Sequence, residues 1–284
     1  MLEIYNFKLI KSGIHIEVYE YRSKKIVKGY KRRKRNNIKT NKNKVKNNLK
    51  LLDEENIQQL DIYDYTKILH KATKKQEIKT KFSISRTRTN LRRTANSNQQ
   101  LNKFLTLTFA QPVTDLQTAN KLFNTAIKRI LRAKPYFEYL AVVEFQKDTD
   151  YHGNIKPQGG SVHYHLLCNI VMPDNMDIFL WERMFSLKYW KNGFVKIKDI
   201  QSVDNMGAYF CKYLSKDMFD KRMFRKKKFF CSRTLKKSIE LTGLKAHSFF
   251  DKYVSTKPIY QRTFTNEYVG LVDYSAYTIN KGEK

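Results

Sequence analysis

Cysteine is scarce in this sequence. Its 284 residues contain only Cys168, Cys211 and Cys231, and no two of them form a Cys-x-x-Cys pair. An odd number of cysteines cannot all pair within one chain, so the pattern suits a reducing compartment and argues against a zinc finger. The length is sufficient for a hydrophobic core in one large domain or two small ones.

Long apolar runs are also absent. No stretch approaches the roughly 20 consecutive apolar residues that a membrane span needs. The first residues, 1–6, have neither the charged n-region nor the apolar h-region of a signal peptide. We therefore expect a soluble, cytoplasmic protein that has no membrane partner.

Acidic residues are few relative to basic ones. Asp and Glu number 26 against 56 Lys and Arg, which gives a net charge of +30 and an isoelectric point near 9.9. Such an excess predicts a polyanionic partner. The 18 Tyr and 18 Phe residues add flat surfaces on which unpaired bases can stack, so the composition favours nucleic acid.

The first hundred residues change character along their length. Residues 1–30 show the alternation of a β-hairpin, and residues 31–100 are expected to form a basic linker followed by a helical segment near residues 53–79. The segment 31–50 is almost wholly Lys, Arg and Asn, which cannot build a core alone. A second basic patch, either a solvated face or a DNA-binding surface, consists of Arg86, Arg88, Arg92 and Arg93.

A compact domain is predicted over residues 101–240. The run 104–109 alternates as a strand, and an amphipathic helix follows, which Thr114 can cap. The next strand, 140–146, carries Glu144 among apolar neighbours. A carboxylate is costly there unless it is paired or bound to a metal, so Glu144 is a candidate metal ligand.

Two histidines share one face of a further predicted strand, residues 162–168. Because side chains alternate along a strand, His163 and His165 point to one side, and their apolar neighbours point to the other. Neutral imidazoles bind metal ions, and two on one face can share an ion if a third ligand is nearby. The strand alone is equally compatible with two ordinary strand histidines.

A predicted helix over residues 206–216 places a phenol beside two lysines. At about 100° per residue, Tyr209 lies along one flank with Lys212 and Lys216, whereas Tyr213 falls within the apolar stripe. Cations beside a phenol favour phenolate and also neutralise phosphate. Tyr209 is therefore the candidate nucleophile, and an ordinary amphipathic helix is the alternative.

Basic and aromatic residues are interleaved beyond this helix. The combination suits contact with a phosphate backbone and stacking of unpaired bases, although a solvated basic face is the simpler interpretation. The residues concerned are Arg225, Lys226, Lys227, Lys228, Phe229 and Arg233. Residues 241–284 form a C-terminal extension without recognisable chemical groups.

These segments, in this order, resemble the HUH endonucleases. The set comprises the strand 104–109, then Glu144, then His163-Tyr164-His165, then Tyr209-Phe210-Cys211-Lys212. Within that superfamily, the sequence is similar to the rolling-circle replication initiators of phages and plasmids of Gram-positive bacteria. The resemblance covers roughly residues 100 to 240.

The resemblance implies an α+β fold with a central antiparallel β-sheet flanked by helices, of the ferredoxin or RRM-like kind, behind a basic N-terminal extension. It also implies Mg²⁺ or Mn²⁺ held by Glu144, His163 and His165. Tyr209 would nick single-stranded or hairpin origin DNA, leaving a 5′-phosphotyrosine link and a free 3′-hydroxyl, and would later rejoin strands. Tyr213 would be a second nucleophile in a two-tyrosine variant of this site.

Other functions remain open. A transposase or relaxase would use the same chemistry, and a non-catalytic basic nucleic-acid-binding protein would explain the charge alone. The sequence contains no Gly-x-x-x-x-Gly-Lys-Ser/Thr motif, so unwinding would require a separate host helicase, and synthesis a host DNA polymerase. The oligomeric state is not indicated by the sequence.

Overall fold

The computed structural model describes residues 3–28, 82–149, 152–157, 159–215, 221–223 and 226–279. The basic segment 31–50 and the expected helix at 53–79 lie outside these ranges, as do Lys216 and Arg225. Among the residues described, no helix is both long enough and apolar enough to cross a bilayer.

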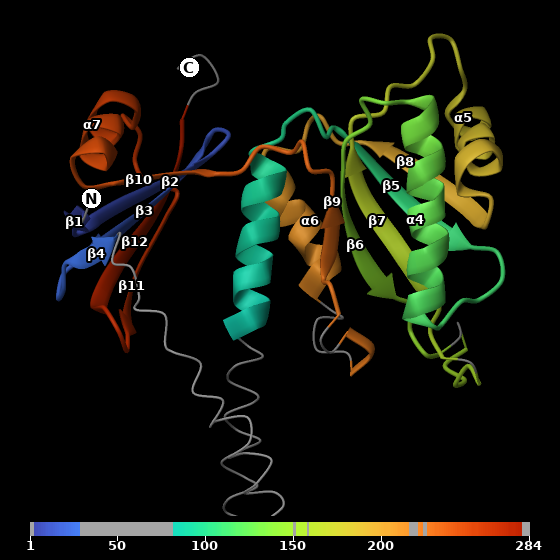
Figure 1. The fold of residues 1–284 in the computed structure, drawn as a ribbon, viewed down its shortest axis with the longest axis horizontal. Helices are drawn as coiled ribbons and strands as arrows, with labels where there is room; N and C mark the ends of the chain where they lie inside the picture. Colours follow the sequence, from blue (N-terminus) through green and yellow to red (C-terminus); the bar gives the residue numbers. More distant parts are fainter. Residues whose placement is uncertain are drawn as a thin grey trace, which may run out of the picture.

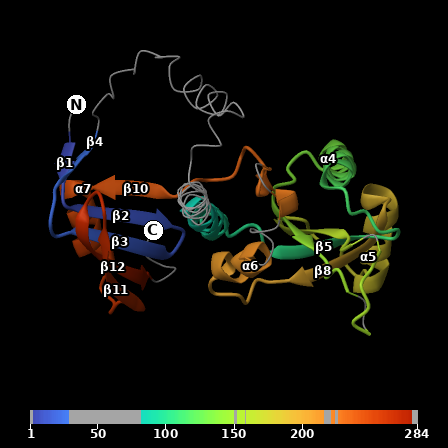
Figure 2. The ribbon, with the colours of Figure 1, turned by 90° about the horizontal axis from the view of Figure 1, so that it is seen from below.

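The chain has an α+β fold with antiparallel sheets flanked by helices, which confirms the expected fold class (Figure 1). Two five-stranded sheets lie on either side of a central pair of helices (Figures 1 and 2). One of these two helices spans residues 82–96, and the other is α6 (Met206–Ser215).

The central sheet is built wholly from antiparallel pairs and contains the strands predicted around Glu144 and the histidines. Its order is β8-β5-β7-β6-β9. The bounds are β5 (Lys103–Phe109), β6 (Tyr139–Phe145), β7 (Val162–Cys168), β8 (Gly193–Asp199) and β9 (Phe229–Cys231).

One face of the central sheet carries the main hydrophobic core. Against it pack α4 (Leu116–Ala133), α5 (Ile178–Phe185) and the π-helical turn Ser186–Trp190. The N-cap of α4 is Asp115, whose carboxylate accepts a hydrogen bond of 2.7 Å from the Thr118 amide. The expected cap at Thr114 was therefore wrong by one residue, because the longer-reaching carboxylate of Asp115 takes that position.

The second sheet joins the two ends of the chain. Its order is β10-β2-β3-β12-β11, so strands near the N-terminus lie between strands near the C-terminus. Residues 1–30 and 241–284, which the sequence analysis treated separately, therefore contribute to the same sheet. The bounds are β2 (Phe7–Ser12), β3 (His15–Tyr21), β10 (Ile239–Thr242), β11 (Tyr260–Asn266) and β12 (Gly270–Thr278).

Smaller elements complete the second unit. The short strands β1 (Glu3–Tyr5) and β4 (Ile26–Lys28) pair with each other, and α7 (Gly243–Tyr253) covers the face of the second sheet that carries Leu9 and Val18. A 3-10 turn, Lys221–Met223, precedes β9 of the central sheet.

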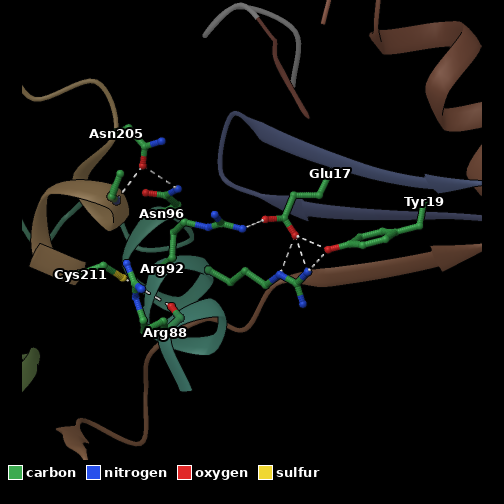
Figure 3. A network of polar contacts seen from close by, with 9 residues as sticks. Glu17, Tyr19, Arg88, Arg92, Asn96, Asn205 and Cys211 are labelled. Atoms are coloured by element: carbon green, nitrogen blue, oxygen red, sulfur yellow. Dashed lines mark hydrogen bonds and ion pairs between the residues drawn. The ribbon is translucent and has the colours of Figure 1, made fainter. Parts of the chain in front are cut away.

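The helical segment 82–96 connects the two sheets through one buried carboxylate. Glu17 of β3, with an 8% exposed side chain, forms ion pairs with both Arg92 and Arg93, and Arg93 also donates to the Tyr19 hydroxyl (Figure 3). The turn at Gly13, where φ is +62°, packs against the end of this helix so closely that a Cβ would lie 2.3 Å from the Asn96 carbonyl oxygen.

The first prediction concerns this ion pair. Glu17→Gln keeps the shape of the side chain but leaves two adjacent guanidinium groups without a counter-charge. We expect the free energy of unfolding to fall by about 2–4 kcal/mol, less than for a fully buried pair because Arg92 is partly solvated. Urea denaturation measures the change.

Glu20→Gln is the matched control, because Glu20 lies on the same strand but is exposed. It should change stability by less than about 0.5 kcal/mol. Equal losses in the two variants would mean that the Glu17 ion pairs do not hold the two sheets together.

Candidate active site

Strand pairing brings the three candidate ligands onto one face of the central sheet. In the register of β6 with β7, Glu144 lies directly opposite His163, and Val142 lies opposite His165. In antiparallel sheets, directly opposite residues point to the same side. Glu144, His163 and His165 therefore lie together on the face that α6 covers.

His165 is held by contacts at both ring nitrogens. Its Nε2 lies 2.5 Å from Glu144 Oε2, and its Nδ1 lies 3.1 Å from Thr106 Oγ1 on β5. The ring is buried and stacks on Phe104, with the ring centroids 5.5 Å apart. These contacts fix the orientation of the imidazole in the way that outer-shell partners orient metal ligands.

His163 has an unused ring nitrogen. Its Nε2 is buried and has no hydrogen-bond partner among the residues that the structure describes. Burial, followed by the neighbouring His165, holds the pKa of His163 below its ordinary value, which favours the neutral ring at pH 7. A buried nitrogen without a partner is costly, and a bound cation would remove that cost.

The chemistry of the donor set fits a divalent cation. Two imidazoles and one carboxylate share the site, and the Nε2 of His163 is unpartnered within the described part of the chain. In those same ranges, no three His, Cys, Asp or Glu side chains are already arranged around a metal position. The direct contact between Glu144 and His165 explains this, because metal binding would require those two groups to exchange their mutual hydrogen bond for bonds to the ion.

Both tyrosines of α6 lie beside the histidines. The Tyr213 ring centroid is 4.4 Å from that of His165 and 4.9 Å from that of Phe104. The Tyr209 hydroxyl is 3.4 Å from the Tyr213 hydroxyl. Helical geometry predicted different surroundings for the two tyrosines, and that separation was wrong: both are half-buried in the same cluster, because Phe104 packs against both rings.

The electrostatic surroundings of the two phenols still differ. Burial, hydrogen bonding to Tyr209 and the nearby Glu144 carboxylate raise the pKa of Tyr213 to about 12, so this phenol is held protonated. The ammonium group of Lys212 lies 6.0 Å from the Tyr209 ring centroid, as the helical spacing predicted. Lys216, the second predicted lysine, lies outside the described residues.

The N-terminus of α6 is fixed to the helical segment 82–96. Asn96 Oδ1 accepts a hydrogen bond of 2.7 Å from the Gly207 amide, and Asn96 Nδ2 donates to Asn205 Oδ1 at 3.2 Å (Figure 3). A Cβ on Gly207 would lie 2.4 Å from the Arg92 carbonyl oxygen, so glycine permits this close approach. One turn further along α6, Cys211 contacts the Arg88 carbonyl.

The first predicted DNA-binding patch is divided by the structure. Arg86 and Arg88 are exposed on the helical segment 82–96. Arg92 and Arg93 instead form ion pairs with Glu17. Only the first two arginines therefore present charge that Glu17 does not already balance.

The second predicted patch is also mixed. Lys226, Lys227 and Arg233 are exposed, whereas Lys228 donates to the Met223 carbonyl. Phe229 is a strand residue that pairs with Val142 and packs against the core on the α6 side. Its ring is therefore only half available for stacking on a base.

Sequence reasoning missed three residues that shape the site. Thr106 and Phe104 lie on β5 and contact His165, and Asn96 anchors α6. The alternation of β5 correctly placed its threonines opposite the core face. Only the register of β5 with β7, which pairs Thr106 with His165, shows which threonine meets which histidine.

The site lies in a stretch with a recognised family pattern. Residues 102–218 match the family model of the replication-associated protein ORF2. That range contains Glu144, both histidines and both tyrosines. No curated protein and no solved structure matches the chain. The similarity links the part of the chain that forms the site to replication, and most of the second sheet lies beyond it.

The second prediction concerns Thr106. Thr106→Val keeps the shape of the side chain but removes the hydroxyl that orients His165, so we expect metal affinity to fall about 10–100-fold. Electron paramagnetic resonance of free Mn²⁺ measures binding without relying on catalysis. Thr108→Val, on the same face and opposite His163, is the control and should change affinity by less than about threefold. Equal effects of the two variants would contradict an orienting role for Thr106.

Proposed function

We propose that this protein is a metal-dependent endonuclease that nicks single-stranded DNA and thereby initiates rolling-circle replication. The observation that supports this most directly is the meeting of two groups of residues on one sheet face. Glu144, His163 and His165 form the candidate metal ligands, and two tyrosine hydroxyls lie against them from α6. The similarity of residues 102–218 to replication-associated proteins agrees with this role.

A Mg²⁺ or Mn²⁺ ion held by Glu144, His163 and His165 would supply positive charge that polarises a phosphate and offsets charge developing during cleavage. The protein's own residues prepare this arrangement. Thr106 and Phe104 hold His165 in place, and Asn96 holds the helix that carries the tyrosines.

Tyr209 is the proposed nucleophile. Its oxygen attacks phosphorus and loses its proton, the bond from phosphorus to the 3′ oxygen breaks, and that oxygen gains a proton. The products are a 5′-phosphotyrosine link and a free 3′-hydroxyl, which can prime synthesis. Tyr213, held protonated, can donate its hydrogen bond to the Tyr209 oxygen as negative charge develops there.

The covalent link preserves the energy of the phosphodiester bond, so the same site can rejoin strands when the reaction reverses. The net charge of +30 attracts DNA, and exposed residues such as Arg86, Arg88 and Lys226 are suited to the phosphate backbone. Host helicase and DNA polymerase would supply unwinding and synthesis.

The third prediction separates the two tyrosines. The purified protein is incubated with Mn²⁺ and a labelled pool of random single-stranded DNA, and covalent protein–DNA adducts are resolved by denaturing electrophoresis. Tyr209→Phe should abolish the adduct. Tyr213→Phe should retain it, with a rate lower by about fivefold to tenfold, because one hydrogen bond to a developing charge is lost.

His163→Ala is the control for metal dependence, and it should abolish the adduct while DNA binding persists, because phosphate contacts supply most of the affinity. Peptide mapping identifies the modified residue. Nucleotide found on Tyr213 would reverse the assignment of the nucleophile. No adduct from the unaltered protein on any DNA would favour a non-catalytic nucleic-acid-binding protein instead.

A further inference from the structure

One face of the second sheet carries a row of aromatic side chains. In the registers of β3, β12 and β11, Tyr19 lies opposite Tyr274, and Tyr274 lies opposite Arg262. Directly opposite residues point to the same side, so these strands share one face, which is also the face of Glu17. We call it the aromatic face, and it comprises Tyr19, Tyr21, Tyr260, Arg262, Phe264 and Tyr274.

The aromatic rings form a continuous path across the strands. The ring centroids of Tyr19 and Tyr274 are 5.0 Å apart, and those of Tyr274 and Tyr260 are 6.1 Å apart. Tyr19 meets the helical segment 82–96 through Arg93, whereas Tyr260 lies on the outermost strand, β11. The path therefore leads from the helix that supports α6 to the edge of the sheet, where β11 is visible in Figure 2.

The outer part of the aromatic face is open to solvent. Tyr260 is 52% exposed, Arg262 is exposed, and Phe264 is half-buried. The guanidinium carbon of Arg262 lies 4.9 Å from the Phe264 ring centroid, so the cation and the ring already form one surface. In contrast, α7 covers the opposite side of the sheet at β2, against Leu9.

Charge is distributed unevenly between the two sides of the sheet. Asp273 and Glu20 face each other across β12 and β3 on the side opposite the aromatic residues. The carboxylates that do share the aromatic face are each neutralised, Glu17 by two arginines and Glu240 by Lys8 and Lys28. The aromatic face thus presents rings and an exposed arginine, which is complementary to a polyanion with unpaired bases.

We propose that Tyr260, Arg262 and Phe264 form an accessory binding surface for single-stranded DNA. Bases would stack on Tyr260 and Phe264, and Arg262 would contact the backbone phosphate between them. Unpaired strands fit better than duplex because the faces of paired bases are covered by their neighbours. This inference rests on the proposed function, since nicking and unwinding produce a single strand near the protein, and it gives the second sheet a role in holding that strand.

The fourth prediction tests this surface with fluorescein-labelled (dT)30 and with a 30-base-pair duplex. The double variant Tyr260→Ala/Phe264→Ala should bind (dT)30 about 5-fold to 100-fold more weakly in fluorescence anisotropy, and duplex nearly as well as before. Tyr260→Phe, which keeps the ring, should retain binding. Arg262→Ala should reduce the salt dependence of (dT)30 binding.

Gln261→Ala/Thr265→Ala is the matched control, because both residues are exposed on β11 but point to the opposite side. It should leave (dT)30 binding unchanged. Equal weakening by the control, or weakening of duplex to the same extent as (dT)30, would overturn the stacking surface. A loss of self-association in the double variant with unchanged (dT)30 binding would instead show that this face binds a second copy of the chain.

The adduct assay distinguishes this inference from the proposed function. Normal adduct formation with unaltered (dT)30 binding in the double variant rejects the accessory surface and leaves the nicking function standing. Weakened (dT)30 binding in a protein that forms no adduct supports the surface and rejects the nicking function.

Discussion

The arrangement of the two sheets depends on the buried carboxylate of Glu17. Two arginines from the helical segment 82–96 converge on it, so this helix cannot shift without exposing an unpaired charge. The same helix holds the start of α6 through Asn96. The position of both tyrosines relative to the histidines therefore depends on contacts made by a sheet that contributes none of the candidate site residues.

Local pattern was sufficient to predict the parts of the site that lie on single strands. The alternation of apolar and polar residues placed His163 and His165 on one face, and the cost of burying Glu144 indicated a polar partner. The helical spacing also placed Lys212 beside Tyr209. Each of these inferences requires only the geometry of one element, which a sequence determines directly.

What could not be predicted depends on contacts between distant segments. The pairing of β2 with β10 joins residues more than 200 positions apart, and no turn sequence indicates it. The contact between Tyr213 and His165 arises because Phe104 fills the space beneath both rings, whereas helical periodicity alone placed Tyr213 in an apolar stripe. Thr106 meets His165 only through strand register.

The strand order of the second sheet also affects how the chain acquires its structure during synthesis. β2 and β3 leave the ribosome first, yet their neighbours β10 and β12 are made last, after a delay of about 10–50 s at ordinary rates of translation. The central sheet can pair in the meantime. A nascent chain thus contains every candidate site residue before it contains the sheet that steadies α6, so the order of strands couples the assembly of the site to completion of translation.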